Sequence, residues 1–301
     1  MKVILGGGIA GLIFAYYNKD YLLLTDHVGG QMSSYFDLGP RYLHKTSKVV
    51  EFLNRLKMPI IDRKIKVGYL SDNGFEEPTE LFRELYFKKS RCVNDLKGFD
   101  PTVLNTNLRE FDVLDVDFKD LVGKLFNKLD LRIYTTKVVS IDIDKCLVTT
   151  SNTQTFRYEH LVSTIPLNIF CKISNLSVPV SLESFDMTYC LLKNTFFEMG
   201  QFDFIYDIRT TTCFHRMTKC KQGIVCDLHE SRLKELNSIS DVFFSLPKKY
   251  SIQTIKNSQI ISLEKDFELK NNRTIKFFGR YGTWNRRFKT ETVIEEAQCS
   301  N

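Results

Sequence analysis

A glycine-rich turn near the N-terminus constrains the fold more than any other stretch of this sequence. Residues 3–12 are VILGGGIAGL, an apolar run that meets glycines with the spacing G-x-G-x-x-G and then continues as apolar sequence. This pattern predicts a strand, a tight turn and a helix whose first amide groups face the pyrophosphate of a dinucleotide. Gly6 permits the turn, Gly8 lets the pyrophosphate approach the backbone, and Gly11 lets helix and strand pack closely.

The composition is that of a folded protein with a mild basic balance. Of 301 residues, 43% are hydrophobic, and the net charge of +6 comes without blocks of like charge. This balance favours an anionic substrate or cofactor and says nothing specific about nucleic acid. The eight cysteines contain no C-x-x-C pair, so neither a zinc site nor another metal site is expected. No run of 18 apolar residues occurs, and we expect a cytoplasmic protein without a membrane partner.

A second buried strand is predicted over residues 22–25, which completes a compact β-α-β unit. In such units an acidic residue after the second strand binds the adenosine ribose. Asp26 is the candidate, about 15 residues past the last glycine, and Thr25 occupies the alternative register. The sequence leaves this choice open.

The remaining pattern predicts alternating helices and strands. The predictions used below are a polar connection over residues 98–115, a helix over 118–129, single strands over 131–142 and 156–163, and a final helix over 290–297.

A second glycine pair indicates which dinucleotide cofactor is bound. Directly after the second strand the chain has DHVGGQMSSYFDLGPRYLH, with Gly29 and Gly30 together. This stretch resembles the flavin-containing amine oxidase superfamily, which includes FAD-dependent amine oxidoreductases and protoporphyrinogen oxidase-like proteins. Within it, GPRYLHKT resembles a segment of UDP-galactopyranose mutase. The resemblance implies that His44 matches a histidine close to the flavin ring and that Arg41 replaces a second one.

Four later segments extend the resemblance to most of the chain. RIYTTKVVSIDID resembles a strand whose backbone, here near Val138, touches the adenine. YEHLVSTIPLNIF resembles the segment in which the chain crosses back from the FAD domain. YDIRTTTCFHRMTK resembles a segment whose arginine, here Arg216, enters the substrate cavity. FFGRYGTWNRRFKTETVIEEA resembles the closing motif, in which Gly279 and Arg280 lie under the flavin and the next helix N-terminus faces it.

The resemblance implies an α/β fold with a Rossmann-like FAD-binding domain of the glutathione-reductase type and an interleaved, smaller α+β substrate domain. The FAD-binding domain is expected to comprise residues 1–62, 115–170 and 256–301, and the substrate domain residues 63–114 and 171–255. The expected FAD-binding residues are Gly6, Gly8, Ile9, Ala10, Gly11, Asp26, Gly29, Gly30, Gln31, Val138, Gly279, Arg280, Thr290, Glu291 and Thr292.

Candidate residues for the substrate face of the flavin follow from the same motifs. The catalytic candidates are His44, Arg41, Arg216 and Arg280, and the substrate candidates are Arg216, Trp284, Arg286 and Arg287. The Arg286–Arg287 pair stands where mutases have two tyrosines, and it would suit an anionic substrate. A purely structural role stays open for each of these residues. His44 could be a buried structural histidine, and Arg280 could belong to a structural ion pair. Arg286–Arg287 could form a solvated basic edge, and Trp284 could lie in the core. No general base is indicated.

Three classes of function fit these observations. The first is an FAD-dependent oxidoreductase that takes a hydride from a C–N or C–C bond of an anionic or amine substrate, which could be carried on a nucleotide or nucleic acid. The second is a non-redox flavoenzyme acting on a sugar nucleotide, as in the mutase. The third is a flavin-free binding protein resembling GDP-dissociation inhibitors. The Gly29–Gly30 and Gly279–Arg280 elements weigh against the third class, because a flavin-free protein does not need both. We expect the first class, and the oligomeric state is open.

Overall fold

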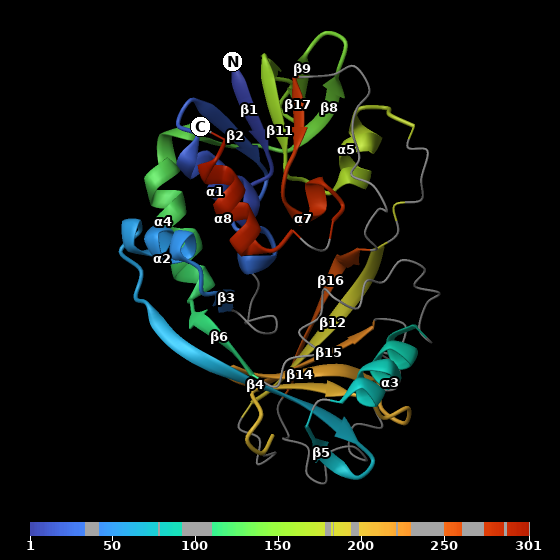
Figure 1. Cartoon of the computed structure of the whole chain (residues 1–301). Helices are drawn as coiled ribbons and strands as arrows, with labels where there is room; N and C mark the ends of the chain where they lie inside the picture. The colour runs from blue at the N-terminus through green and yellow to red at the C-terminus, as the bar shows by residue number, and fades with distance from the viewer. Residues whose placement is uncertain are drawn as a thin grey trace.

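Two large β-sheets form the body of the protein, one parallel and one mostly antiparallel (Figure 1). The computed structural model describes residues 1–33, 42–77, 79–91, 110–177, 182, 184–193, 199–220, 222–229, 250–260, 274–285 and 288–300. The predicted α/β fold is confirmed, because the N-terminal glycine turn leaves a strand of the parallel sheet and opens a helix.

The parallel sheet carries the glycine turn at its centre. Its strand order is β17-β11-β1-β2-β7. The strands are β1 (Lys2–Leu5), β2 (Tyr21–Thr25), β7 (Ile133–Thr135), β11 (His160–Ser163) and β17 (Ile275–Phe277). Both faces of such a sheet are covered, which explains why β1 and β2 are continuous apolar runs instead of alternating ones. The strands come from the beginning, the middle and the end of the chain.

Helices cover one face of this sheet and a small antiparallel sheet lies on the other. The covering helices are α1 (Ile9–Tyr17), α2 (Ser47–Arg55), α4 (Phe118–Leu129) and α8 (Thr290–Gln298). The opposite core involves β8 (Val138–Asp142), β9 (Leu147–Thr150), β10 (Thr155–Arg157) and α5 (Leu167–Ile173). Short turns of helix are η1 (Gly30–Ser33), η4 (Asp130–Arg132) and α7 (Gly279–Gly282). Among the described helices, none is both long and apolar enough to cross a membrane.

Gly123, inside α4, provides a test of the helix assignment. A Cβ added there would meet nothing within 4 Å. Gly123→Ala is therefore expected to stabilise the protein by about 0.5–1 kcal/mol, because alanine loses less backbone entropy on folding. Gly74→Ala is the matched control: its Cβ also meets open space, but its φ of +115° makes the substitution strained. Urea unfolding should move in opposite directions for the two variants, and a destabilised Gly123→Ala would contradict the prediction.

The larger sheet extends away from the glycine turn (Figure 1). Its strand order is β16-β12-β15-β14-β13-β4-β6-β3, with β5 paired to β4. The strands are β3 (Tyr42–His44), β4 (Ile61–Ser71), β5 (Gly74–Glu76), β6 (Glu110–Asp115), β12 (Ser184–Leu192), β13 (Phe204–Asp207), β14 (Phe214–Cys220), β15 (Gly223–His229) and β16 (Tyr250–Ile260). Helix α3 (Glu80–Arg91) packs near β14.

The expected domain ranges separate most strands of the two sheets. All five parallel strands fall within the ranges expected for the FAD-binding domain. Strand β3 falls within the same ranges but pairs with β6 of the larger sheet, and the ends of β4, β6 and β16 cross the expected boundaries.

Two secondary-structure predictions were wrong. Residues 131–142 form two strands, β7 and β8, which belong to different sheets. Residues 156–163 are likewise divided between β10 and β11. Of the predicted polar connection, residues 98–109 lie outside the described residues, and residues 110–115 form strand β6, which pairs with both β3 and β4.

Candidate functional site

Three glycine segments that are distant in sequence meet beside the start of α1. The Gly29 amide donates a 2.7 Å hydrogen bond to the Gly7 carbonyl, and Gly8 and Gly29 form an isolated parallel bridge. From the far end of the chain, Gly279 comes so close that an added Cβ would lie 2.7 Å from the Ala10 Cβ. The structure thus brings together three segments expected to bind the cofactor, 6–11, 29–31 and 279–280.

Gly8 occupies a different environment from the other two glycines of the first motif. A Cβ on Gly11 would lie 1.9 Å from the Gly6 carbonyl oxygen, and one on Gly6 would lie 2.7 Å from the Thr164 hydroxyl. A Cβ on Gly8 would meet nothing within 4 Å. Gly8 is the N-cap of α1, and among the described residues no side chain caps this helix. Uncapped amides at a helix N-terminus attract phosphate, so this arrangement fits a pyrophosphate group.

The two candidates for the ribose contact have different environments. The Thr25 hydroxyl is buried; its oxygen accepts hydrogen bonds from the Gly7 and His27 amides at 2.9 and 3.2 Å and donates to the His27 carbonyl at 2.9 Å. It therefore holds the glycine turn against the end of β2. Asp26, the next residue, is exposed and leaves its carboxylate accessible. This geometry favours Asp26 for the ribose.

Val138 lies close to the same end of the sheet. The Thr136 amide donates a 2.6 Å hydrogen bond to the Thr25 carbonyl, and β8 begins two residues later. The backbone of β8 therefore starts beside the residues that follow β2, and the adenine contact at Val138 stays a prediction.

Two side-chain hydrogen bonds connect the early motifs with the end of the chain. The Gln31 amide group donates to the Tyr281 hydroxyl at 2.8 Å, which joins η1 to α7. The His44 backbone amide donates to the Glu291 carboxylate at 2.5 Å, which joins β3 to the first turn of α8. Glu291 thus bonds to the protein itself, a contact that its motif did not indicate. Thr290 and Thr292 lie in the same turn and are partly buried.

His44 lies against two aromatic rings on the larger sheet. Its ring centroid is 5.8 Å from that of Tyr42 and 5.4 Å from that of Phe111. Burial lowers the pKa of His44, and the nearby Glu291 carboxylate opposes this effect without cancelling it. The imidazole is therefore neutral at pH 7, in a partly buried and largely aromatic environment.

This lowered pKa predicts how stability depends on pH. Below the ordinary histidine pKa of about 6.5, the unfolded chain binds a proton that folded His44 still excludes, so stability falls as the pH falls toward the lower folded value. His44→Gln should reduce the loss of unfolding free energy between pH 7.5 and 5.5, measured by urea titration. His160→Gln, at an exposed position, is the control. An unchanged pH dependence in His44→Gln would contradict the prediction.

Arg216 lies in β14 and is already paired. Its guanidinium forms an ion pair with Asp227 on the adjacent strand β15 and lies 5.3 Å from the centroid of the Phe204 ring. Although burial disfavours the charged form, the Asp227 carboxylate raises the pKa of Arg216 above its usual value. The role expected for Arg216, an anchor for an anionic group of the substrate, did not include this carboxylate as a partner. An acidic residue within the apolar run GIVCDLH was the available signal.

The other substrate candidates are dispersed. Trp284 is fully buried in the apolar core on the far face of the parallel sheet, with Phe170 and Leu161 in the same cluster, so it is not on the wall of a substrate site. Arg280 is partly exposed on α7, and no carboxylate of the described residues pairs with it. Arg41, Arg286 and Arg287 lie outside the described residues.

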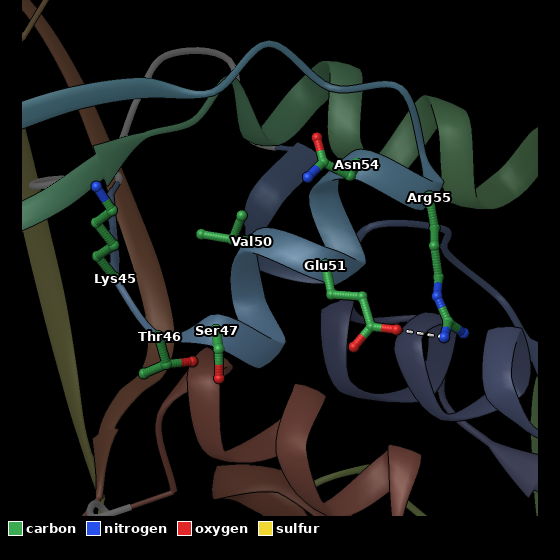
Figure 2. A pocket seen from close by; sticks show the side chains of 7 residues that line it. All are labelled: Lys45, Thr46, Ser47, Val50, Glu51, Asn54 and Arg55. Atoms are coloured by element: carbon green, nitrogen blue, oxygen red, sulfur yellow. Dashed lines mark hydrogen bonds and ion pairs between the residues drawn. The ribbon is translucent and has the colours of Figure 1, made fainter.

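A separate hollow of about 670 Å³ lies over α2 (Figure 2). It is lined by Lys45, Thr46, Ser47, Val50, Glu51, Asn54 and Arg55. Its charged groups are already paired, Glu51 with Arg55 and Lys45 with Asp62. None of the expected site residues lines it, and the candidate site remains the region around Gly8 and His44.

Comparison with solved structures identifies the fold. A reduced UDP-galactopyranose mutase matches with a TM-score of 0.71 and 13% identity, over 99% of this chain and 94% of the mutase. Cyclohexylamine oxidase from Brevibacterium oxydans IH-35A matches with a TM-score of 0.66 and 11% identity, over 99% and 96%. Wild-type putrescine oxidase bound to putrescine matches with a TM-score of 0.62 and 10% identity, over 99% and 97%.

The chain therefore has the fold shared by the flavin amine-oxidase-like proteins and UDP-galactopyranose mutase, as its motifs led us to expect. No family model and no curated protein matches the sequence. At identities of 10–14% the likeness establishes the fold, and activity has to be argued from the site.

Proposed function

We propose that this protein is an FAD-dependent oxidoreductase that takes a hydride from a C–N bond of its substrate. The observation that carries the proposal is the open position at Gly8, in front of the uncapped helix α1 and beneath the second glycine pair. The fold shared with cyclohexylamine and putrescine oxidases supports an amine as the group that is oxidised.

In this proposal the N-terminal amides of α1 and the Gly29–Gly30 turn hold the cofactor pyrophosphate, while Asp26 holds the adenosine ribose. Bound FAD would supply the hydride acceptor. The neutral His44, with Tyr42 and Phe111 beside it, forms an aromatic surface that excludes water from the substrate. An uncharged imidazole in this position also avoids repelling a protonated amine.

The test is the visible absorption spectrum of the purified protein, before and after anaerobic dithionite. We expect flavin bands that bleach on reduction, and FAD among the compounds released by acid. Anaerobic mixing with cyclohexylamine, putrescine or benzylamine should bleach the same bands. A colourless protein that cannot be reconstituted with FAD would contradict the proposal and favour partner binding instead.

A second candidate function has specific support. The segment GPRYLHKT and the match to the mutase structure both favour a non-redox reaction on a sugar nucleotide. The two candidates differ in one measurement. Interconversion of sugar-nucleotide isomers by the dithionite-reduced protein, without bleaching by any amine, would support the second candidate over the first.

A further inference from the structure

Six side chains form a single row across the larger sheet. The strand register places Tyr69, Tyr206, Arg216, Asp227, Tyr189 and Gln253 as successive direct neighbours on β4, β13, β14, β15, β12 and β16. Directly opposed residues project from the same face of a sheet. The Arg216–Asp227 ion pair and the 5.5 Å separation of the Tyr69 and Tyr206 rings agree with this. We call these six residues the central row.

The central row belongs to the face that carries His44. Tyr42, whose ring contacts His44, packs in the same apolar cluster as Tyr69 and Tyr206. The row therefore continues the surface that we assign to the substrate, and the inference below rests in this respect on the proposed function.

Three buried polar atoms without hydrogen bonds lie on this row. Within the described part of the chain, the Arg216 Nε, the Asp227 Oδ1 and the Gln253 Oε1 are buried and form no hydrogen bond. The same is true of the Thr218 hydroxyl, two residues beyond Arg216 on the same face. Buried polar atoms almost always have partners, because leaving them unpaired costs folding free energy. Four of them in one place indicate a ligand.

The buried carboxylate of Asp207 differs from that of Asp227, because both of its oxygens accept hydrogen bonds. Asp207 is fully buried and accepts hydrogen bonds from the Arg209 side chain at 2.8 and 3.1 Å and from the Thr212 hydroxyl at 2.9 Å. Lys89 lies 3.3 Å away on α3. Where a buried carboxylate has a structural role in this protein, its oxygens are thus bonded. Asp227 instead keeps one oxygen unbonded.

The charges of the row indicate what it binds. Arg216 and Asp227 compensate each other, so the row offers an anion no net positive charge. Its unbonded atoms are one guanidinium donor and two oxygen acceptors, and the neighbouring Thr218 adds one hydroxyl. We propose that the central row binds an uncharged polar group of the substrate, one that carries adjacent donors and an acceptor as a primary amide does, and that it does not bind an anionic group.

Three para-substituted benzylamines test this proposal: 4-(aminomethyl)benzamide, its isostere 4-(aminomethyl)benzoate, and 4-methylbenzylamine, which lacks the polar group. Calorimetric binding to the protein as purified needs no turnover. We expect the amide to bind about tenfold or more tightly than either of the others. Equal affinities, a preference for the benzoate, or no measurable binding of the amide would overturn the proposal.

Two matched threonine variants distinguish binding from structure. Thr218→Val removes an unbonded hydroxyl, so it should weaken amide binding about fivefold while the protein stays as stable as before. Thr188→Val is the control, since its hydroxyl lies on the opposite face and bonds to Thr254 at 2.8 Å. It should lower stability and leave amide affinity unchanged. The reverse pattern would overturn the proposal.

Asp227→Asn tests the charge balance. With Arg216 no longer compensated, the benzoate should become the tightest of the three ligands. If this variant fails to fold, the two threonine variants still decide the question. A colourless protein that prefers the amide would refute the proposed function alone, whereas a flavoprotein that prefers the benzoate would refute this inference alone.

Discussion

Replacing Gly8 with alanine is expected to deprive the protein of FAD while its fold remains intact. Gly8 has a φ of −67° and a ψ of 174°, which alanine adopts readily, and the added Cβ meets no protein atom within 4 Å. The methyl group would instead occupy the space in front of α1 that we assign to the pyrophosphate. We expect the FAD content to fall at least about tenfold, with an unfolding midpoint close to that of the original protein.

Gly11→Ala provides the comparison. Its Cβ would lie 1.9 Å from the Gly6 carbonyl oxygen, a backbone atom that cannot move away without breaking the β1–α1 junction. This variant should lose at least about 3 kcal/mol of stability along with its FAD. Flavin absorbance and urea unfolding, measured on both variants, separate the two effects. Full FAD occupancy in Gly8→Ala would contradict the location of the pyrophosphate.

Asp207→Ala is expected to destabilise the protein by about 3–5 kcal/mol. The substitution removes the carboxylate that Lys89 and Arg209 share, and the side chains of these two cations are only 3% and 14% exposed. Since Lys89 is in α3 and Asp207 in β13, the helix would lose its ionic attachment to the larger sheet. Urea unfolding measures the change directly.

Two further variants isolate the cause. Lys89→Met combined with Asp207→Ala removes the more deeply buried of the two cations that lose the carboxylate, so it should recover part of the lost stability. Glu51→Ala breaks the exposed pair with Arg55 on α2 and should cost no more than about 0.5 kcal/mol. If Glu51→Ala and Asp207→Ala cost the same, burial would not explain the effect of Asp207.

The N-terminal unit could be predicted from the sequence because its information is local. Gly6, Gly8 and Gly11 determine where β1 ends and α1 begins. Strand β1 occupies the expected residues 2–5, whereas α1 begins at Ile9, three residues before the expected start at residue 12, and ends as expected at Tyr17. The helix over 118–129 was likewise predicted with its observed ends, because its apolar residues recur with helical spacing.

Strand partners depend on residues elsewhere in the chain, which periodicity does not reveal. Between Arg157 and His160 the chain stops pairing with β9 and begins pairing with β1, without a glycine or proline to mark the change. The same holds between β7 and β8, where the Thr136 amide bonds to the Thr25 carbonyl, more than 100 residues earlier in the sequence. Such changes of sheet are set by long-range contacts.

In the candidate site, too, the residues with a local sequence signal could be predicted and those that depend on distant neighbours could not. The glycine segments were identified by their spacing, whereas the environment of Arg216 depends on a cross-strand neighbour, Asp227, that no motif identifies. Trp284 shows a further limit. A single tryptophan gives no periodic signal, and its position in the core follows from the packing of α7 under β11 and β17.

The assembly of the parallel sheet has a consequence for synthesis on the ribosome. Strand β11 needs β17 as its outer neighbour, and α8 completes the core over α1, so residues 275–298 must be available before the domain can close. Until then, the apolar surfaces of α1 and the central strands remain uncovered. Contacts of such long range also slow folding. We therefore expect the nascent chain to acquire FAD only after its last helix has emerged, and to depend until then on chaperones that cover exposed strands.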